Sequence, residues 1–360
     1  MTLSAKINLT RESASANFHL ELEFNIPSDG ITALFGPSGS GKTSLLRCIA
    51  GLEEKAIASI RFKNDLWQNH DYFLPTHKRR VGFVFQRQNL FPHLSSRQNI
   101  EFAQKRVNST LDNLNVNSVI DNLDIEHLLN KYPGQMSGGE QQLVALARTL
   151  KSNPALLLMD EPLSSLDGPR KNRLLEIIKD LNKKHGLPIL YVTHSVDEVL
   201  KIADHLLVIE DGKLSVNKPL MEAFDDETIN HQVWPHIGAV IEATLTSQTT
   251  EYGMHKLEFQ GGNLWIPASK KGIGFKTRLV ILARDISIAL SNHTDTSILN
   301  RVQAVITKIQ EDVNPAFLQI HSKAGPNNFR ALVTKKSFNT LELETGKSIW
   351  LQIKSVAIST

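Results

Sequence analysis

Gly36-Pro-Ser-Gly-Ser-Gly-Lys42-Thr43 is the stretch that decides the fold of this chain. It matches the phosphate-binding loop pattern G-x-x-x-x-G-K-[ST] throughout, and its members are Gly36, Pro37, Ser38, Gly39, Ser40, Gly41, Lys42 and Thr43. The apolar run 31–35 predicts a buried strand before the loop, and 44–50, closed by Gly51, predicts a helix after it. Strand, glycine-rich loop and helix together predict nucleotide binding rather than an ordinary Gly/Ser turn.

Phosphate binding accounts for each residue type in this loop. Glycines let successive backbone N–H groups face a phosphate chain without a Cβ in the way. The start of the following helix adds a positive dipole. Lys42 can reach the β- and γ-phosphates, and the Thr43 hydroxyl can bind Mg²⁺.

Two carboxylates end a second apolar run. The segment Ala155-Leu-Leu-Leu-Met-Asp160-Glu161 predicts a buried strand that stops in an acidic pair. Because ligands bind at the carboxyl ends of strands in open α/β sheets, we expect this pair beside the phosphate loop. Asp160 would then hold Mg²⁺, usually through water, and Glu161 would polarise the attacking water. Acids at strand ends also cap helices, but the phosphate loop upstream favours the catalytic role.

A second anion site lies between these motifs. In Met136-Ser-Gly-Gly-Glu140, the Ser and Glu have the S-x-x-E spacing of a capping box ahead of an apolar helix. A serine and two glycines at a helix start also bind anions, and here these are Ser137, Gly138 and Gly139. One nucleotide needs only one phosphate cradle, so a second suggests that two copies share a phosphate.

In this order, the motifs resemble those of the ATP-binding cassette (ABC) family over residues 1–230. The resemblance implies an α/β P-loop NTPase fold with a helical insert at about 97–150. It implies that Gln86 contacts Mg²⁺ and the attacking water, and that His194 contacts the γ-phosphate and organises that water. Phe18 is the candidate for stacking on adenine. The chain has M-S-G-G-E where L-S-G-G-Q is commonest, a mild departure that keeps Ser-Gly-Gly.

Three smaller features have structural interpretations. Ser195 and Glu198 predict a second capping box immediately after His194. Cys48, the only cysteine, is expected to be a small buried apolar residue on the helix after the loop. The basic cluster 77–80 predicts a solvated turn before a strand.

Composition sets outer limits on the class of protein. The chain has 360 residues, 41% hydrophobic and 21% charged, which is typical of a soluble globular protein with two or three domains. One cysteine excludes intrachain disulfides and suits a reducing cytosol. No signal-peptide core and no run of roughly 18 apolar residues occurs. A net charge of +3 is too small to argue for nucleic acid, and the histidines show no metal-ligand spacing.

Residues 231–360 change character, after a soft boundary near 225–235. Short alternating strands replace helical spacing, and 240–289 is echoed by 302–359. This predicts an all-β domain of two five-stranded OB-like units. The second unit, at about 296–359, resembles the Mop domain, which binds oxyanions. Alternatively, this unit could serve only in dimerisation. If it binds an oxyanion, the candidate hydrogen-bond donors are Ser297, Lys335, Ser337, Lys354 and Ser355.

With this domain, the chain resembles the ATPase subunits of bacterial molybdate importers. The resemblance implies ATP and Mg²⁺ as ligands, a homodimer, integral membrane permease subunits and, indirectly, a periplasmic oxyanion-binding protein. It also implies a peripheral position on the cytoplasmic face of the inner membrane, and no nucleic acid. The segment 89–94, with Phe91 and Leu94, is expected to dock on the permease.

Two alternatives stay open. The same motor could serve sulfate, polyamines or sugars, since the ATPase does not itself contact the solute. A soluble ABC ATPase acting on DNA or ribosomes would usually have long coiled-coil inserts or two cassettes. This chain has one cassette and no sustained heptads.

Overall fold

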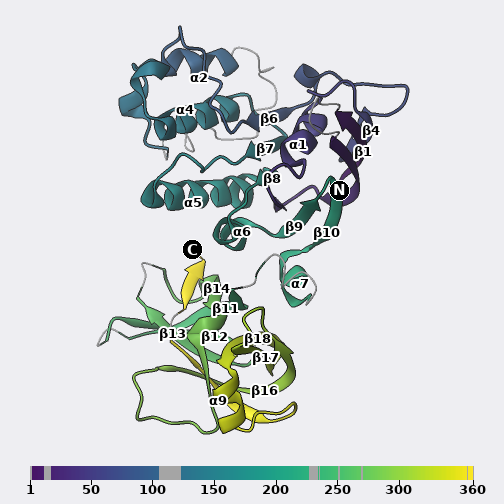
Figure 1. Ribbon diagram of the computed structural model, residues 1–360. Coiled ribbons are helices and arrows are strands. Elements are labelled where there is room, and N and C mark those ends of the chain that lie inside the picture. Colours follow the sequence, from purple (N-terminus) through teal and green to yellow (C-terminus); the bar gives the residue numbers. More distant parts are fainter. Residues whose placement is uncertain are drawn as a thin grey trace. The chain divides into compact units, whose positions relative to one another are not determined.

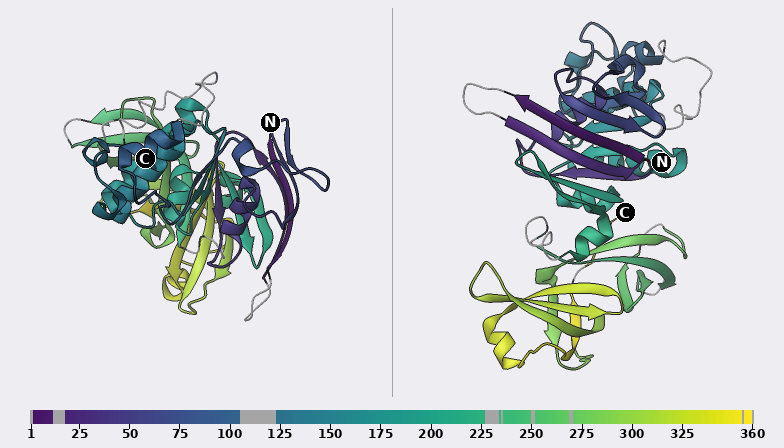
Figure 2. Two further views of the ribbon diagram at one scale, coloured as in Figure 1. Left: turned by 90° about the horizontal axis from the view of Figure 1, so that it is seen from above. Right: turned by 90° about the vertical axis from the view of Figure 1, so that its right-hand side faces the viewer.

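The computed structural model describes residues 2–11, 18–104, 123–226, 234, 236–249, 252–268, 271–354 and 356–359. The chain divides into two compact units, Met1–Ala223 and Phe224–Thr360 (Figures 1 and 2). Part of the predicted helical insert, 105–122, and the candidate donor Ser355 lie outside the described residues. Within the described ranges, no helix is both long and apolar enough to cross a membrane.

Among the described residues of the N-terminal unit, ten strands form one sheet in the order β5-β4-β1-β2-β10-β9-β3-β8-β7-β6. The strands are β1 (Thr2–Arg11), β2 (Phe18–Pro27), β3 (Ile31–Phe35), β4 (Ile57–Phe62), β5 (Asp65–Gln68), β6 (Val81–Val84), β7 (Leu156–Asp160), β8 (Ile189–Val192), β9 (His205–Glu210) and β10 (Lys213–Pro219). Strands β9, β3, β8, β7 and β6 run parallel, and β1, β2, β4 and β5 pair antiparallel. The sheet is therefore mixed, with its parallel half at one end.

The described helices of this unit are α1 (Lys42–Ala50), α2 (Ser96–Gln104), α4 (Gly138–Lys151), α5 (Gly168–His185), α6 (Val196–Ile202) and α7 (Leu220–Asp225), with short 3₁₀ turns at Thr76–Lys78, Glu126–Leu128 and Pro133–Gln135. Helices α1 and α4 pack on the parallel strands, α2 packs on α4, and α7 follows β10 (Figure 1). Strands β7 and β8 are buried at every position, because they are covered on both faces. Two apolar clusters result: α4 and α5 pack in one, and α1 packs in the other with β1, β2 and β4.

The basic cluster 77–80 is not simply a solvated turn, and that prediction is wrong for Arg79. This residue is only 2% exposed. Its guanidinium donates to the carbonyls of Cys48 and Ile49 at 3.0 and 2.8 Å, which end α1. Burial lowers the pKa of Arg79 to about 10, so it stays charged at neutral pH. Arg79 thus caps the helix that follows the phosphate loop. Cys48 is buried, as predicted.

In its described part, the C-terminal unit holds two five-stranded sheets, ordered β13-β12-β11-β14-β20 and β15-β19-β16-β17-β18. The first includes β11 (Ile237–Thr249), β12 (Met254–Phe259), β13 (Gly262–Pro267) and β14 (Lys276–Leu282). The second includes β16 (Asn300–Glu311), β17 (Phe317–Ala324), β18 (Asn327–Thr334) and β19 (Ser348–Ile353). A 3₁₀ turn, Ala283–Asp285, and the helix α9 (Lys335–Thr340) complete the unit. The predicted fold class, a P-loop cassette followed by an all-β OB-like domain, is confirmed.

The two halves of this unit exchange their last strands. β15 (Ile286–Ala289) follows the first four strands in the chain but pairs with β19 of the second sheet. β20 (Ala357–Ser359) follows β19 but pairs with β14 of the first sheet. Both sheets share one apolar core, with Ile241 and Leu264 from one and Ile320 and Leu351 from the other. Each half therefore depends on the other to complete its sheet.

Candidate active site

The phosphate loop joins β3 to α1 and takes a conformation that requires glycine. Gly36, Gly39 and Gly41 have φ angles of 146°, 84° and 108°. A Cβ on Gly36 would lie 2.1 Å from the Ile209 carbonyl oxygen, and one on Gly41 would lie 2.6 Å from Leu20 Cδ1. A side chain at Gly36 would displace the backbone of β9, and one at Gly41 would displace the Leu20 and Phe18 side chains.

Lys42 folds back over the loop. Its ammonium donates to the carbonyls of Gly36 and Pro37 at 2.8 and 2.6 Å, and the residue is 6% exposed. Burial lowers the pKa of Lys42, and the nearby charges of Glu161 and Asp160 oppose that shift. The closest acceptors of the Lys42 ammonium are neutral carbonyls, so its positive charge is not neutralised by them and can attract an anion.

Thr43 and Asp160 meet although they are far apart in the sequence. The Thr43 hydroxyl, in the first turn of α1, donates to Asp160 Oδ2 at the end of β7 across 2.9 Å. Burial raises the pKa of Asp160; the Thr43 hydrogen bond and Lys42 oppose this, and Glu161 adds to it. Two oxygen ligands at the mouth of a phosphate loop fit Mg²⁺, which binds through few protein oxygens together with substrate phosphates. No group of three or more His, Cys, Asp and Glu in the described ranges could hold a metal by itself.

Glu161 lies at the centre of the three residues to which the sequence assigns catalysis. Its Oε2 accepts a hydrogen bond from Gln86 Nε2 at 3.2 Å, and its Oε1 lies 3.3 Å from His194 Nδ1. Its backbone has a φ of 46°, which non-glycine residues rarely adopt, and its N–H donates to the Val192 carbonyl. The loops after β6, β7 and β8 thus meet at one carboxylate.

Phe18 lies beside the loop. Its ring Cζ would be 2.8 Å from a Cβ on Gly41, and the ring packs partly buried on the cluster that holds α1. The structure therefore places the candidate adenine-stacking side chain next to the last glycine of the phosphate loop.

The second anion site is a closed capping box in this structure. The carboxylate of Glu140 accepts from the backbone N–H and hydroxyl of Ser137 at 2.7 and 2.8 Å, and Glu140 N–H donates back to the hydroxyl. These hydrogen bonds, first the one from the Ser137 backbone, lower the pKa of Glu140. Gly139 lies against Leu166, which a Cβ would approach to 2.7 Å. Ser137 is the N-cap of α4 and Lys42 begins α1, and these helices belong to different apolar clusters.

The predicted second capping box, after His194, is only half formed. Ser195 Oγ accepts from Glu198 N–H at 3.4 Å. The Glu198 side chain does not return to Ser195; it turns inward and accepts from the hydroxyls of Tyr191 and Thr193 at 2.6 and 2.7 Å. It also pairs with Lys171 at 2.5 Å. A buried tyrosine hydroxyl needs a hydrogen-bond partner. Tyr191, in the apolar run before His194, was therefore the sequence signal that Glu198 could turn inward, and the S-x-x-E spacing does not contain it.

The segment 89–94 is packed on α2 more closely than expected. The Phe91 ring meets Phe102 edge-on with centroids 4.7 Å apart, and the Arg148 guanidinium lies 5.4 Å from its centroid. Buried Asn99 accepts from Phe91 N–H at 2.9 Å and donates to the Leu94 carbonyl at 3.1 Å. Phe91 and Leu94 are half-buried, so only part of each side chain is open to a docking partner.

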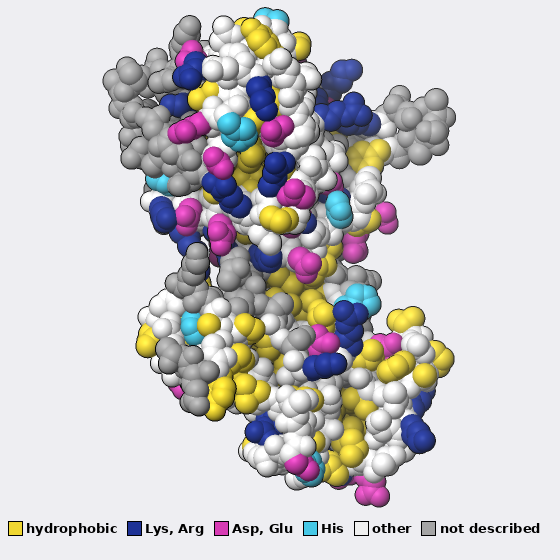
Figure 3. All heavy atoms as spheres, turned by 90° about the vertical axis from the view of Figure 1, so that its left-hand side faces the viewer, with side chains coloured by type: hydrophobic (Ala, Val, Ile, Leu, Met, Phe, Trp, Pro, Cys, Tyr) yellow, Lys and Arg dark blue, Asp and Glu magenta, His cyan; other side chains and the backbone are white. Residues whose placement is uncertain are grey.

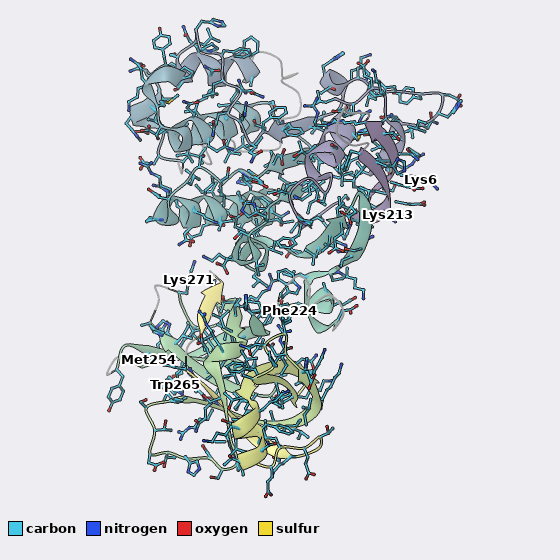
Figure 4. All side chains as sticks on the ribbon, in the orientation of Figure 1. Lys6, Lys213, Phe224, Met254, Trp265 and Lys271 are labelled. Carbon is cyan, nitrogen blue, oxygen red and sulfur yellow. The ribbon has the colours of Figure 1, made fainter. Side chains whose placement is uncertain are left out.

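A groove on the antiparallel strands is a separate feature. Lys6 and Lys213, from β1 and β10, lie on it (Figure 4), together with Glu21 and Glu23. Lys6 pairs with Glu23 at 2.9 Å. Because both signs of charge line the groove, it gives no preference for an anion, and none of the predicted ATP-site residues lines it.

The candidate oxyanion donors of the C-terminal unit are not equivalent. Lys335 pairs with Glu311 of β16 at 3.3 Å, a carboxylate that lies outside the stretches resembling the Mop domain. Ser337 is engaged with Thr334 at the start of α9. Ser297 and Lys354 are exposed; Ser297 lies shortly before β16, and Lys354 directly follows β19. The ammonium of Lys335 therefore already has a carboxylate partner in this structure.

The C-terminal unit also exposes large apolar side chains. Figure 3 shows hydrophobic side chains gathered on one face of this unit. Exposed examples are Tyr252, Ile273, Leu290, Leu299 and Val313. Met254 and Trp265 lie on neighbouring strands of its first sheet (Figure 4). An exposed apolar surface favours association with another protein surface.

A phosphate loop after β3, an acidic pair at the end of the parallel strand β7 and a Ser-Gly-Gly helix start define this unit as a P-loop ATPase cassette. The family described as "ABC transporter" matches residues 20–164, and the family described as "TOBE domain" matches residues 296–359. Together with full-length relatives, this shows that the chain belongs to the ATP-binding cassette transporter family. The resemblance and the ATPase class inferred from the motifs are confirmed.

The relatives match over nearly the whole chain. The chain is 40% identical to the molybdenum import ATP-binding protein ModC of Thiobacillus denitrificans, over 95% of this chain and 94% of that protein. It is 41% identical to the protein of the same name from Saccharophagus degradans, over 98% of each chain. Among solved structures, a dimeric post-hydrolysis state of the ATP-binding cassette MJ0796 bound to ADP and Pi matches with a TM-score of 0.54. It is 27% identical and covers 61% of this chain and 99% of that one.

Proposed function

We propose that this chain is the ATP-hydrolysing subunit of a molybdate importer, with residues 1–230 as the ATP-binding domain and 231–360 as an accessory domain. The observation that carries hydrolysis is Glu161, held between Gln86 and His194 at 3.2 and 3.3 Å. The names of the full-length relatives support molybdate as the solute.

Each residue of the site has its own role in hydrolysis. Backbone N–H groups of 36–43 and the Lys42 ammonium bind the phosphates. Thr43, Asp160 and Gln86 would hold Mg²⁺, which neutralises charge on the transferred phosphoryl group. Glu161 orients the attacking water and accepts its proton, and His194 contacts the γ-phosphate and holds that water in line.

Two copies would complete two sites. Ser137, Gly138 and Gly139 of one cassette face the phosphate loop of the other, since the fold keeps them away from their own loop. The dimeric state named for the MJ0796 cassette supports this pairing. The accessory domain, with its exposed apolar side chains, adds a second surface for self-association.

The importer would place this subunit against integral membrane permease subunits on the cytoplasmic face of the inner membrane. The segment 89–94 would make that contact, because it lies shortly after Gln86 in the chain and is fixed to α2 by Asn99. A periplasmic oxyanion-binding protein would deliver the solute from the other side, with no direct contact to this chain.

Transport by a strain lacking this chain tests the solute. We expect cellular molybdenum to fall at limiting molybdate, and the wild-type chain but not Lys42→Ala to restore it. Uptake of labelled sulfate and polyamine serves as the control. Loss of sulfate or polyamine uptake with normal molybdenum would assign the motor to another solute. Normal uptake of all of them would favour a soluble ATPase.

For the C-terminal unit, we propose a regulatory oxyanion site that reports cytoplasmic molybdate. Its support is the TOBE match and the exposed Lys354, whose ammonium has no carboxylate partner in the described part of the chain. Calorimetry on the whole chain with molybdate, tungstate and sulfate tests it, with Lys354→Met as the variant and Lys336→Met as the control. No heat with molybdate or tungstate would leave dimerisation as the role of this unit.

A further inference from the structure

Glu198 is the most heavily engaged carboxylate near the candidate site. It lies on α6 and is 5% exposed. Its Oε2 accepts from Tyr191 and Thr193, and its Oε1 pairs with Lys171 at 2.5 Å. A buried carboxylate is retained only where several donors compensate its lost hydration, and here three donors from two other parts of the chain do so.

One branch of these contacts fixes the backbone around His194. The Thr193 hydroxyl donates to Glu198 and also accepts from the Ser195 N–H at 3.0 Å. The residues on both sides of His194 are therefore tied to the same hydroxyl. The His194 side chain itself is 66% exposed. Few side-chain contacts hold the ring, so the backbone at 193–195 sets its distance to Glu161.

The other branch leads to the segment 165–167. Lys171 lies in the first turn of α5, whose N-cap is Asp167, and Lys171 N–H donates to the Asp167 carbonyl at 2.8 Å. Just before it, Leu166 lies against Gly139. The chain of contacts thus runs from the Ser-Gly-Gly helix through the segment 165–167 and Lys171 to Glu198, and ends at His194.

We propose that Glu198, through the Thr193 hydroxyl, is the positioning residue that holds His194 against Glu161 and links that placement to the segment beside Gly139. This inference rests on the proposed role of His194 in hydrolysis. It predicts that the approach of a second copy at the Ser-Gly-Gly helix adjusts His194 through the Lys171–Glu198 pair.

The sharpest variant is Thr193→Val, which keeps the shape of the side chain and removes the hydroxyl. We expect kcat for ATP to fall by about tenfold, because small displacements of catalytic groups are costly, with KM within about twofold. Thr193→Ser, which keeps the hydroxyl, should retain wild-type kcat. Glu198→Gln should lower kcat similarly. Asp180→Asn, which breaks the exposed pair with Lys184 on α5, the helix of Lys171, is the control and should change nothing.

A His194→Ala background separates this inference from the proposed function. If Thr193 acts through His194, Thr193→Val should cause no further loss in that background. An unchanged kcat in Thr193→Val, or an equal loss with and without His194, would overturn the positioning role. An unchanged kcat in His194→Ala alone would overturn the role of His194 itself. Thermal unfolding of each variant shows whether the protein is folded at the assay temperature. If kcat falls only in variants that are unfolded at that temperature, the inference is also contradicted.

Discussion

The carboxylate of Glu140 accepts the only proton of the Ser137 hydroxyl, across 2.8 Å. The same carboxylate accepts the Ser137 N–H at 2.7 Å. Lys131 and His127 lie 3.8 and 4.0 Å from its other oxygen. In the proposed dimer, a phosphate oxygen reaching Ser137 must compete with this carboxylate for the hydroxyl proton and approach a negative charge.

Glu140→Gln should therefore promote ATP-driven pairing of the cassettes. Gln preserves the capping box at this position and removes the charge. We expect the ATP concentration for half-maximal dimerisation to fall by about three- to tenfold, which corresponds to about 1 kcal/mol, the scale of one hydrogen bond. Cross-linking at the cassettes, in a background that binds but does not hydrolyse ATP, measures it. A higher ATP requirement in Glu140→Gln would show that the carboxylate assists pairing.

Glu161→Gln should separate binding from hydrolysis. Gln keeps the size of the side chain and the contact with Gln86, but it cannot accept the proton of water. We expect kcat to fall by about 10²-fold or more, with ATP affinity unchanged. Phosphate release and nucleotide binding are measured on the same preparation. Turnover near the wild-type rate would remove Glu161 from the role of base.

Ser137→Arg in that same background should abolish ATP-driven cassette pairing. The long cationic side chain fills the space where the second copy's phosphate loop would dock. We expect strong ATP-dependent cross-linking in Glu161→Gln and none in the double variant. Total dimer content is not informative, since the C-terminal units have exposed apolar surface of their own. Equal cassette cross-linking in both proteins would exclude Ser137 from the interface.

Arg79→Met should destabilise the cassette without touching the phosphates. The change removes the Arg79 donor from the Ile49 carbonyl, and it leaves the Cys48 carbonyl with the Gly51 N–H alone. We expect the free energy of unfolding to fall by about 3 kcal/mol. Lys78→Met, an exposed neighbour, is the control and should be near neutral. Equal stability of both variants in urea unfolding would show that water replaces the guanidinium.

The motifs of the ATP site could be predicted because phosphate chemistry fixes residue types at short spacing. Lys42 and Thr43 follow from one loop, and Asp160 follows from a strand end. The partners of Arg79 and Glu198 could not be predicted in this way. Arg79 reaches carbonyls of a helix some 30 residues earlier, and Glu198 reaches Lys171 on another helix. Their burial depends on the packed fold, which local spacing does not encode.

The exchange of β15 and β20 shows the same limit. The internal sequence repeat predicted two similar units, and the last strand of each unit has a similar apolar pattern. Similar strands fit either sheet, so the local sequence does not decide which sheet each one joins. The observed partners, β19 for β15 and β14 for β20, come from the three-dimensional fold.

Phe91→Ala tests whether the segment 89–94 couples hydrolysis to transport. The ring packs on Phe102 and Arg148, so its loss should lower the free energy of unfolding by about 1–3 kcal/mol, as for a half-buried aromatic. If the segment also docks on the permease, molybdate uptake should fall further than basal ATPase activity of the purified subunit. Phe102→Ala removes the same ring pair from the α2 side and is the matched control. Uptake and ATPase activity that fall in parallel in both variants would assign Phe91 to packing alone.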